Sequence, residues 1–167
     1  MKRMTRIGLL IVLASLLSAG NAIAGDGKDF GDGKFDPGNT VDIENLNEPF
    51  DPDTGELNEE ADIFVWLLTA EQAATPPATV GEALDLFPAI SFPLGVTSFT
   101  NLDAGEYVLV ASNASYLFGL DESAPFVADT DYSAAALTVS EGSVSVTVAN
   151  TDSPTLLPEI SIGGSGE

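Results

Sequence analysis

The apolar positions of this chain fall into short runs that are separated by turn residues, a pattern typical of β-strands. The run Ile63–Leu68 is apolar and rich in β-branched and aromatic side chains. A run of this length and composition predicts a buried strand rather than a helix. Two further strands are expected at Val96–Asn101 and Glu106–Ser112, on either side of a turn at residues 102–105.

The clearest alternation of apolar and polar residues lies near the C-terminus. Residues 135–139 and 144–148 form two apolar runs on either side of Glu141 and Gly142. In the second run, valine occupies positions 144, 146 and 148, and polar residues stand between them. This pattern predicts a β-hairpin whose valines face one way.

Three intervening segments carry weaker patterns. Val80–Phe87 is expected to form one or two helical turns, with Thr79 as the cap and Pro88 as the stop. Residues 69–79 contain alanine pairs and two prolines and are expected to form a loop. Residues 116–118 are expected to add a short strand.

Several short strands with turn signals between them predict an all-β fold, a single immunoglobulin-like β-sandwich. The sandwich is expected at residues 61–150. Residues 25–60 are rich in Gly, Asp and Pro and are expected to form a disordered acidic arm. Residues 151–167 lose the pattern and are expected to form a flexible tail.

Four residues around the turn at 102–105 carry a resemblance. Phe99, Leu102, Gly105 and Tyr107 follow the spacing F-x-x-L-x-x-G-x-Y and lead into an apolar strand. This phrase resembles one found in carboxypeptidase regulatory-like and other prealbumin-like domains. The resemblance implies that Phe99 and Leu102 are buried, that Gly105 permits a tight turn and that Tyr107 begins the returning strand.

The same resemblance implies a prealbumin-like sandwich over about residues 60–150, closed by the C-terminal hairpin. Domains of this kind generally stabilise, space or bind, and are generally not enzymes. A fold is compatible with many functions, so this implication is an analogy.

The N-terminus has the organisation of a secretory signal peptide at residues 1–24. Three basic residues among the first six precede the apolar run Ile7–Leu17, and an A-x-A cleavage site ends at Ala24. The run is shorter than the ~20 residues that span a bilayer. We therefore expect cleavage after Ala24 and a secreted, periplasmic or cell-surface location, without membrane insertion of the mature chain.

Charge changes the picture further. The chain has 5 Lys and Arg against 26 Asp and Glu. Loss of the signal peptide removes three of the five cations and leaves 2 against 26, a net charge of −24. Beyond Lys34 the sequence has no Lys, Arg or His, so the domain must take its counter-charge from solution. We expect a fold that salt or divalent cations stabilise, and no binding to nucleic acid, which requires clustered Lys or Arg.

The composition also excludes most catalytic chemistries. The chain has no Cys and no His, and both of its arginines lie in the signal peptide. Thiol, triad, zinc and phosphoryl-transfer mechanisms therefore lack their residues. We predict that the protein is not an enzyme and requires no cofactor. The remaining enzymatic alternative is a hydrolase that uses a pair of carboxylates.

The acidic stretch 51–62 is the candidate metal site. The candidate calcium ligands, at the spacing of EF-hand loop positions 1, 3, 9 and 12, are Asp51, Asp53, Glu59 and Asp62. Calcium takes six to eight oxygen ligands, of which these could supply several. Gly55 and Glu56 depart from the EF-hand pattern, so a solvated acidic loop is the alternative.

These expectations lead to an exported acidic β-sandwich protein with a structural, adhesive or binding role. Its partner is expected to be a surface or extracytoplasmic protein or a carbohydrate. One alternative is a calcium-binding protein that uses the loop 51–62, and the other is the carboxylate-based hydrolase.

Overall fold

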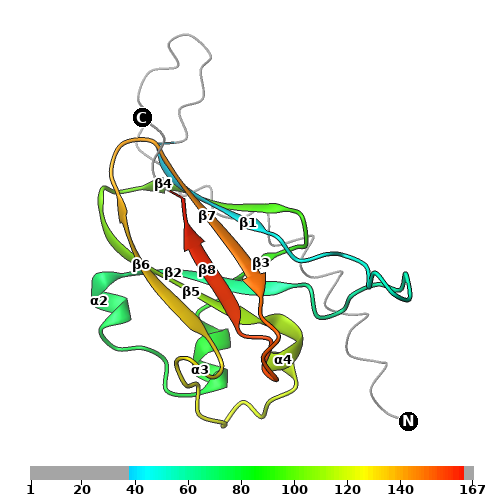
Figure 1. Ribbon diagram of the computed structural model, residues 1–167. Coiled ribbons are helices and arrows are strands. Elements are labelled where there is room, and N and C mark those ends of the chain that lie inside the picture. Colours follow the sequence, from blue (N-terminus) through cyan, green and yellow to red (C-terminus); the bar gives the residue numbers. More distant parts are fainter. Residues whose placement is uncertain (1–37, 164–167) are drawn as a thin grey trace. The chain divides into compact units, whose positions relative to one another are not determined.

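The computed structural model describes residues 38–163, which form two four-stranded β-sheets packed face to face (Figure 1). The first sheet has the order β4 (Val96–Leu102), β1 (Asn39–Asn45), β7 (Ser143–Asn150) and β8 (Pro158–Ile162). The second has the order β3 (Ala89–Ser91), β2 (Ile63–Thr69), β5 (Gly105–Asn113) and β6 (Ser133–Val139). The all-β sandwich expected from the sequence is confirmed.

The inner core lies between the two sheets and is made of aliphatic side chains. β1 supplies Val41 and Ile43, which are fully buried. β7 supplies Val144, Val146 and Val148, while its serines at 143 and 145 are exposed. The predicted alternation along this strand is therefore confirmed, because one face of the strand meets the core and the other meets solvent.

A second, aromatic core covers the outer face of the second sheet. Phe64, Trp66 and Leu68 of β2 point into it, whereas Ile63 and Val65 point into the inner core. Three short helices cover this face, as Figure 1 shows: α2 (Ala70–Ala73), α3 (Val80–Asp85) and α4 (Ala114–Phe118). Burial on both faces explains the unbroken apolar run of this strand. Each large side chain so buried stabilises the fold by about 1.5–3 kcal/mol.

The helices match the sequence expectations in part. Thr79 caps α3 as predicted, and its hydroxyl accepts a hydrogen bond from the Glu82 amide at 3.3 Å. The strand predicted at 116–118 is wrong, because Asn113 accepts the Tyr116 amide at 2.8 Å and starts α4 there. The loop predicted at 69–79 contains α2, which a capping box at Thr69 begins. No helix in the described part of the chain is long and apolar enough to cross a membrane.

The predicted C-terminal hairpin is wrong in its pairing, although both strands exist. β6 pairs with β5 in the second sheet, whereas β7 pairs in the first sheet, parallel to β1 and antiparallel to β8. Gly142 (φ 91°) makes the turn between the two sheets. Its amide donates to the Asn39 side chain at 3.3 Å, so the turn is attached to β1 rather than closing a hairpin.

The predicted domain limits of 61 and 150 are too narrow. β1 lies within the expected acidic arm, yet it pairs with β4 on one side and β7 on the other. β8 lies within the expected tail, yet it pairs with β7. Both strands are held by pairing with strands that are distant in the sequence. Such pairing is hard to predict from the local pattern of a short, partly polar segment. The predicted signal peptide, 1–24, and the first part of the arm lie outside the described residues.

The turn that carries the prealbumin-like phrase passes the chain from β4 to β5, and so from one sheet to the other. Phe99 and Leu102 are half-buried against the inner core. The left-handed residue is Asn101 (φ 57°) rather than Gly105. The hydroxyl of Tyr107 donates to the carbonyl oxygen of Asp103 at 3.1 Å, which fastens the connection at the start of β5.

Candidate functional site

The acidic segment between β1 and β2, residues 46–62, contains a tight turn at residues 51–56. Phe50 and Leu57 form an antiparallel bridge, and the Asp51 amide donates to the Glu56 carbonyl oxygen at 2.8 Å. One carboxylate oxygen of Asp51 accepts the backbone amides of Asp53 and Thr54, at 2.8 and 3.0 Å. These two hydrogen bonds, that from Thr54 first, lower the pKa of Asp51. The Asp51 carboxylate therefore organises its own turn.

The four predicted calcium ligands are not brought together. Asp51, Asp53 and Glu59 are exposed along the segment, while Asp62 is half-buried at the start of β2. Burial raises the pKa of Asp62. Among residues 38–163, no group of three or more acidic side chains is arranged to hold a metal ion. The four carboxylates are therefore not gathered into one cluster within the described residues.

Asparagine side chains hold the base of this loop, a feature that the sequence analysis missed. The carbonyl oxygen of Ala61 accepts hydrogen bonds from Asn45 Nδ2 and Asn47 Nδ2, both at 2.9 Å. Asn45, which is fully buried, also donates to the Ser91 carbonyl oxygen at 2.7 Å. The end of β1 is thereby joined to the start of β2 and to β3.

The neighbouring carbonyl is held in the same way. Glu60 O accepts hydrogen bonds from Asn113 Nδ2 at 2.7 Å and from Asn150 Nδ2 at 2.6 Å. Asn45, Asn113 and Asn150 are the last residues of β1, β5 and β7. This shared position is the signal that could have revealed the network. In a domain without cationic side chains, neutral amides supply the donors that lysine or arginine would otherwise provide.

Hydroxyl groups play the corresponding role around Asp42 on β1. Its carboxylate accepts hydrogen bonds from Ser143 Oγ at 2.5 Å, Ser98 Oγ at 2.6 Å and, more weakly, Thr40 Oγ1 at 3.4 Å. The hydrogen bonds from Ser143 and Ser98 lower the pKa of Asp42. This carboxylate is therefore stabilised in its ionised form without a positive partner.

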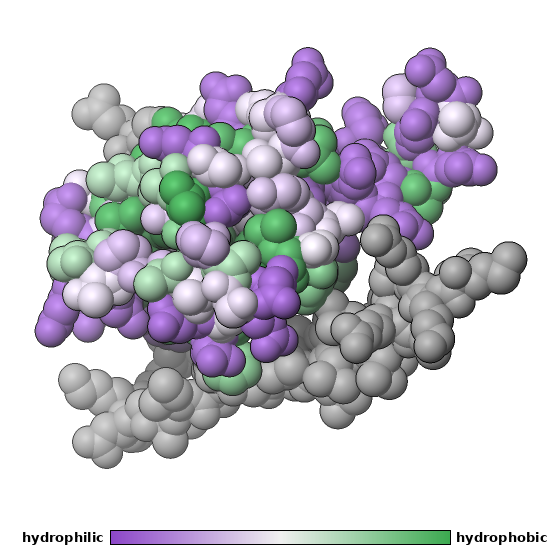
Figure 2. Space-filling model, turned by 90° about the horizontal axis from the view of Figure 1, so that it is seen from below, coloured by the Kyte–Doolittle hydropathy of each residue, from purple (hydrophilic) through white to green (hydrophobic). Residues whose placement is uncertain are grey.

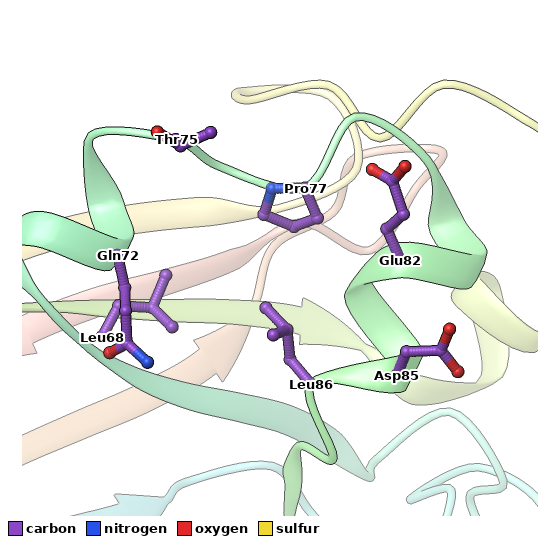
Figure 3. Close-up of a pocket in the computed structure, with 7 residues that line it drawn as sticks. All are labelled: Leu68, Gln72, Thr75, Pro77, Glu82, Asp85 and Leu86. Atoms are coloured by element: carbon purple, nitrogen blue, oxygen red, sulfur yellow. The ribbon is translucent and has the colours of Figure 1, made fainter.

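A hollow lies between α2 and α3 and has a volume of about 370 Å³. Its lining comprises Leu68, Gln72, Thr75, Pro77, Glu82, Asp85 and Leu86. Figure 3 shows Leu86 directed into the hollow and the Asp85 carboxylate directed away from it. The Glu82 carboxylate accepts the Ala78 amide at 2.7 Å. The hollow thus offers an apolar floor rather than the facing carboxylate pair that a hydrolase requires.

Several of the exposed large apolar side chains of the described residues lie on one segment, residues 86–102, which we call the β3–β4 edge. This segment leaves α3, forms β3 at the end of one sheet and continues into β4 at the end of the other. The exposed fractions of its apolar side chains are 85% for Phe87, 54% for Phe92, 60% for Leu94 and 64% for Val96. In Figure 2, seen from the side of α3 and α4, apolar groups reach the surface among hydrophilic ones.

The sequence signal for this edge is an absence of charge. Residues 86–102 contain no Asp, Glu, Lys or Arg and are flanked by Asp85 and Asp103. The edge therefore differs from the rest of this acidic chain in having no carboxylates and several exposed apolar side chains. Exposed apolar patches of this kind mark interaction sites. The β3–β4 edge is therefore the candidate binding surface.

A scan of the sequence against protein-family models and a search of curated proteins each gave no match.

Proposed function

We propose that this chain is an exported, acidic β-sandwich module with a structural or adhesive role, which acts by binding through its β3–β4 edge. The observation that carries the proposal is the exposure of Phe87, Phe92, Leu94 and Val96 on a charge-free edge. When a partner covers exposed apolar side chains, their burial stabilises the complex by about 25 cal/mol per Å² of apolar surface.

Three further features support this proposal. The A-x-A site that ends at Ala24 favours export, and the phrase from Phe99 to Tyr107 resembles modules that space or bind. The donors to Glu60, Ala61 and Asp42 are neutral side chains. Such a domain keeps all its negative charge, which opposes nonspecific contact between like-charged bodies. The partner class expected is an extracytoplasmic protein surface.

Site-specific photo-crosslinking in exporting cells tests this role. A photoreactive amino acid replaces Phe92 in one variant of the full chain and Glu141, at the exposed β6–β7 turn, in a matched control. A binding role through the edge gives a discrete adduct from position 92 and none from position 141. Absence of an adduct at 92, or equal adducts at both positions, would contradict it.

A further inference from the structure

We propose that the β3–β4 edge is a self-association surface, on which a second copy of this chain docks about a two-fold axis. This inference rests on the proposed function and names its partner. The first argument is electrostatic. Two copies, each with a charge near −24 after signal removal, repel one another over their acidic surfaces. The segment 86–102 places no carboxylate of its own in the contact.

The nature of the surface favours a second copy over a cationic partner. A basic protein is attracted to the acidic faces, and an edge without charge gives it no electrostatic reason to bind there. An uncharged apolar surface is best matched by another uncharged apolar surface. A second copy presents the same side chains, and a two-fold contact is self-complementary by construction.

Backbone conformation supplies an independent argument. Phe87 and Leu94 adopt positive φ values of 51° and 53°, which bulky residues disfavour and which Gly or Asn would accept more readily. Because both side chains are exposed, burial within one copy does not offset this cost. A cover formed by a second copy would supply the missing burial, in keeping with the occurrence of strained residues at functional positions.

The strand edge itself is open to pairing. β4 is the last strand of the first sheet, and its residues Val96–Phe99 include no charge and no proline. Natural sheets usually block such edges with charges or proline. The opposite end of the same sheet, β8, begins with Pro158 and Glu159. The unblocked end is therefore the one that carries the exposed apolar side chains.

Salt controls this association in a characteristic direction. The screening length falls from about 10 Å at 0.1 M salt to about 3 Å at 1 M. The register also places the carboxylate-bearing residue Glu44 opposite Val96, so some repulsion reaches the edge. Self-association therefore strengthens with salt, whereas binding to a basic partner weakens with salt.

Sedimentation velocity of the processed protein, at about 0.1 M and about 2 M NaCl, tests the proposal. The expected result is a dimer that forms in the higher salt. Leu94→Asn should raise the dimer dissociation constant at least about tenfold and leave the thermal midpoint unchanged or higher, because Asn tolerates a positive φ. Leu57→Asn is the matched control: this residue is 68% exposed but lies on the acidic loop, and the variant should dimerise like the wild type.

A wild type that stays monomeric in high salt would overturn the proposal. So would a folded Leu94→Asn variant that dimerises normally, or a Leu57→Asn variant that loses the dimer. The photo-crosslink from position 92 separates the two proposals. An adduct with a mass other than twice that of the chain rejects self-association and keeps the binding role, whereas no adduct rejects the binding role itself.

Discussion

The indole Nε1 of Trp66 donates a hydrogen bond of 3.0 Å to the carbonyl oxygen of Ala83. This bond joins the centre of the second sheet to α3, and both residues are buried. The Trp66 ring also lies 6.0 Å from that of Phe126, so the same side chain contacts the loop that follows α4. Trp66 is thus one residue through which the sheet contacts both α3 and the loop after α4.

Trp66→Phe is expected to lower the free energy of unfolding by about 1–3 kcal/mol, because it removes the buried indole hydrogen bond and shrinks a core side chain. The Ala83 carbonyl oxygen would then keep only its longer hydrogen bond, of 3.3 Å, from the Leu86 amide. Urea unfolding followed by far-ultraviolet circular dichroism measures this loss. Tyr107→Phe is the control, since its hydrogen bond to Asp103 lies at the exposed surface and is worth less. Equal losses in the two variants would contradict the anchoring role of Trp66.

Asn45→Asp is expected to be more damaging, by more than about 3 kcal/mol at neutral pH. The substitution keeps the size of the side chain but removes its two donated hydrogen bonds and places a carboxylate against two carbonyl oxygens. Asn101→Asp makes the same chemical change at an exposed site and should cost little. Chemical denaturation of both variants compares them directly, and similar losses would refute the part assigned to the asparagine network.

Asp42→Asn is expected to destabilise the protein at neutral pH, and the loss should vanish in acid. The pKa of Asp42 is lowered in the folded state, so the ionised carboxylate adds stability above its unfolded pKa of about 3.9. That stability is lost as the pH falls through the folded pKa. Urea midpoints of the variant and the wild type should begin to converge below about pH 3.9 and coincide only below the lower, folded pKa. A difference that persists below the folded pKa would be inconsistent with this linkage.

Asp62→Asn is expected to show the opposite sign. Burial raises the pKa of Asp62, so the ionised form costs stability above the folded pKa, and this cost disappears below the unfolded value of about 3.9. The variant should be more stable than the wild type at neutral pH and equal to it in acid. A variant less stable at neutral pH would show that the carboxylate of Asp62 has a stabilising partner.

Salt is expected to raise the thermal midpoint between about 0.1 M and about 1 M NaCl, because it screens repulsion among carboxylates. Calcium should act as a diffuse counter-ion, since Asp51, Asp53, Glu59 and Asp62 are not gathered. Calorimetry with and without calcium should therefore give the same response for Asp53→Asn and for Asp152→Asn at an exposed position elsewhere. A calcium response lost in Asp53→Asn alone would restore the acidic loop as a calcium site.

The local elements could be predicted because short-range chemistry specifies them. The run Ile63–Leu68 is apolar throughout because β2 is buried on both faces. Thr79 begins α3 through capping, whereas the helix ends at Asp85, before the end at Phe87 that Pro88 predicted. The alternation in β7 reflects one buried face. Each signal lies within a few residues of the element that it specifies.

The candidate site could be predicted less well. The acidic spacing from Asp51 to Asp62 gave a ligand pattern, but the folded segment spreads these carboxylates along a turn and a strand start. The asparagine network at Glu60 and Ala61 joins residues that are far apart in the chain. The β3–β4 edge is a continuous segment, but its exposure to solvent cannot be read from the sequence. Both properties arise from the packing of the two sheets.

The sequence by itself determined the acidic charge, the absence of Lys, Arg and His side chains beyond Lys34 and the positions of most strands. It also determined which catalytic side chains the chain lacks. Tertiary structure decided which strands pair: it placed β1 between β4 and β7, and β6 and β7 in opposite sheets. Strand formation follows from the local alternation of side chains, whereas the choice of partner depends on contacts made across the whole chain. The exposed edge from Leu86 to Leu102 follows from that choice, because strands at the end of a sheet keep one side open to a partner.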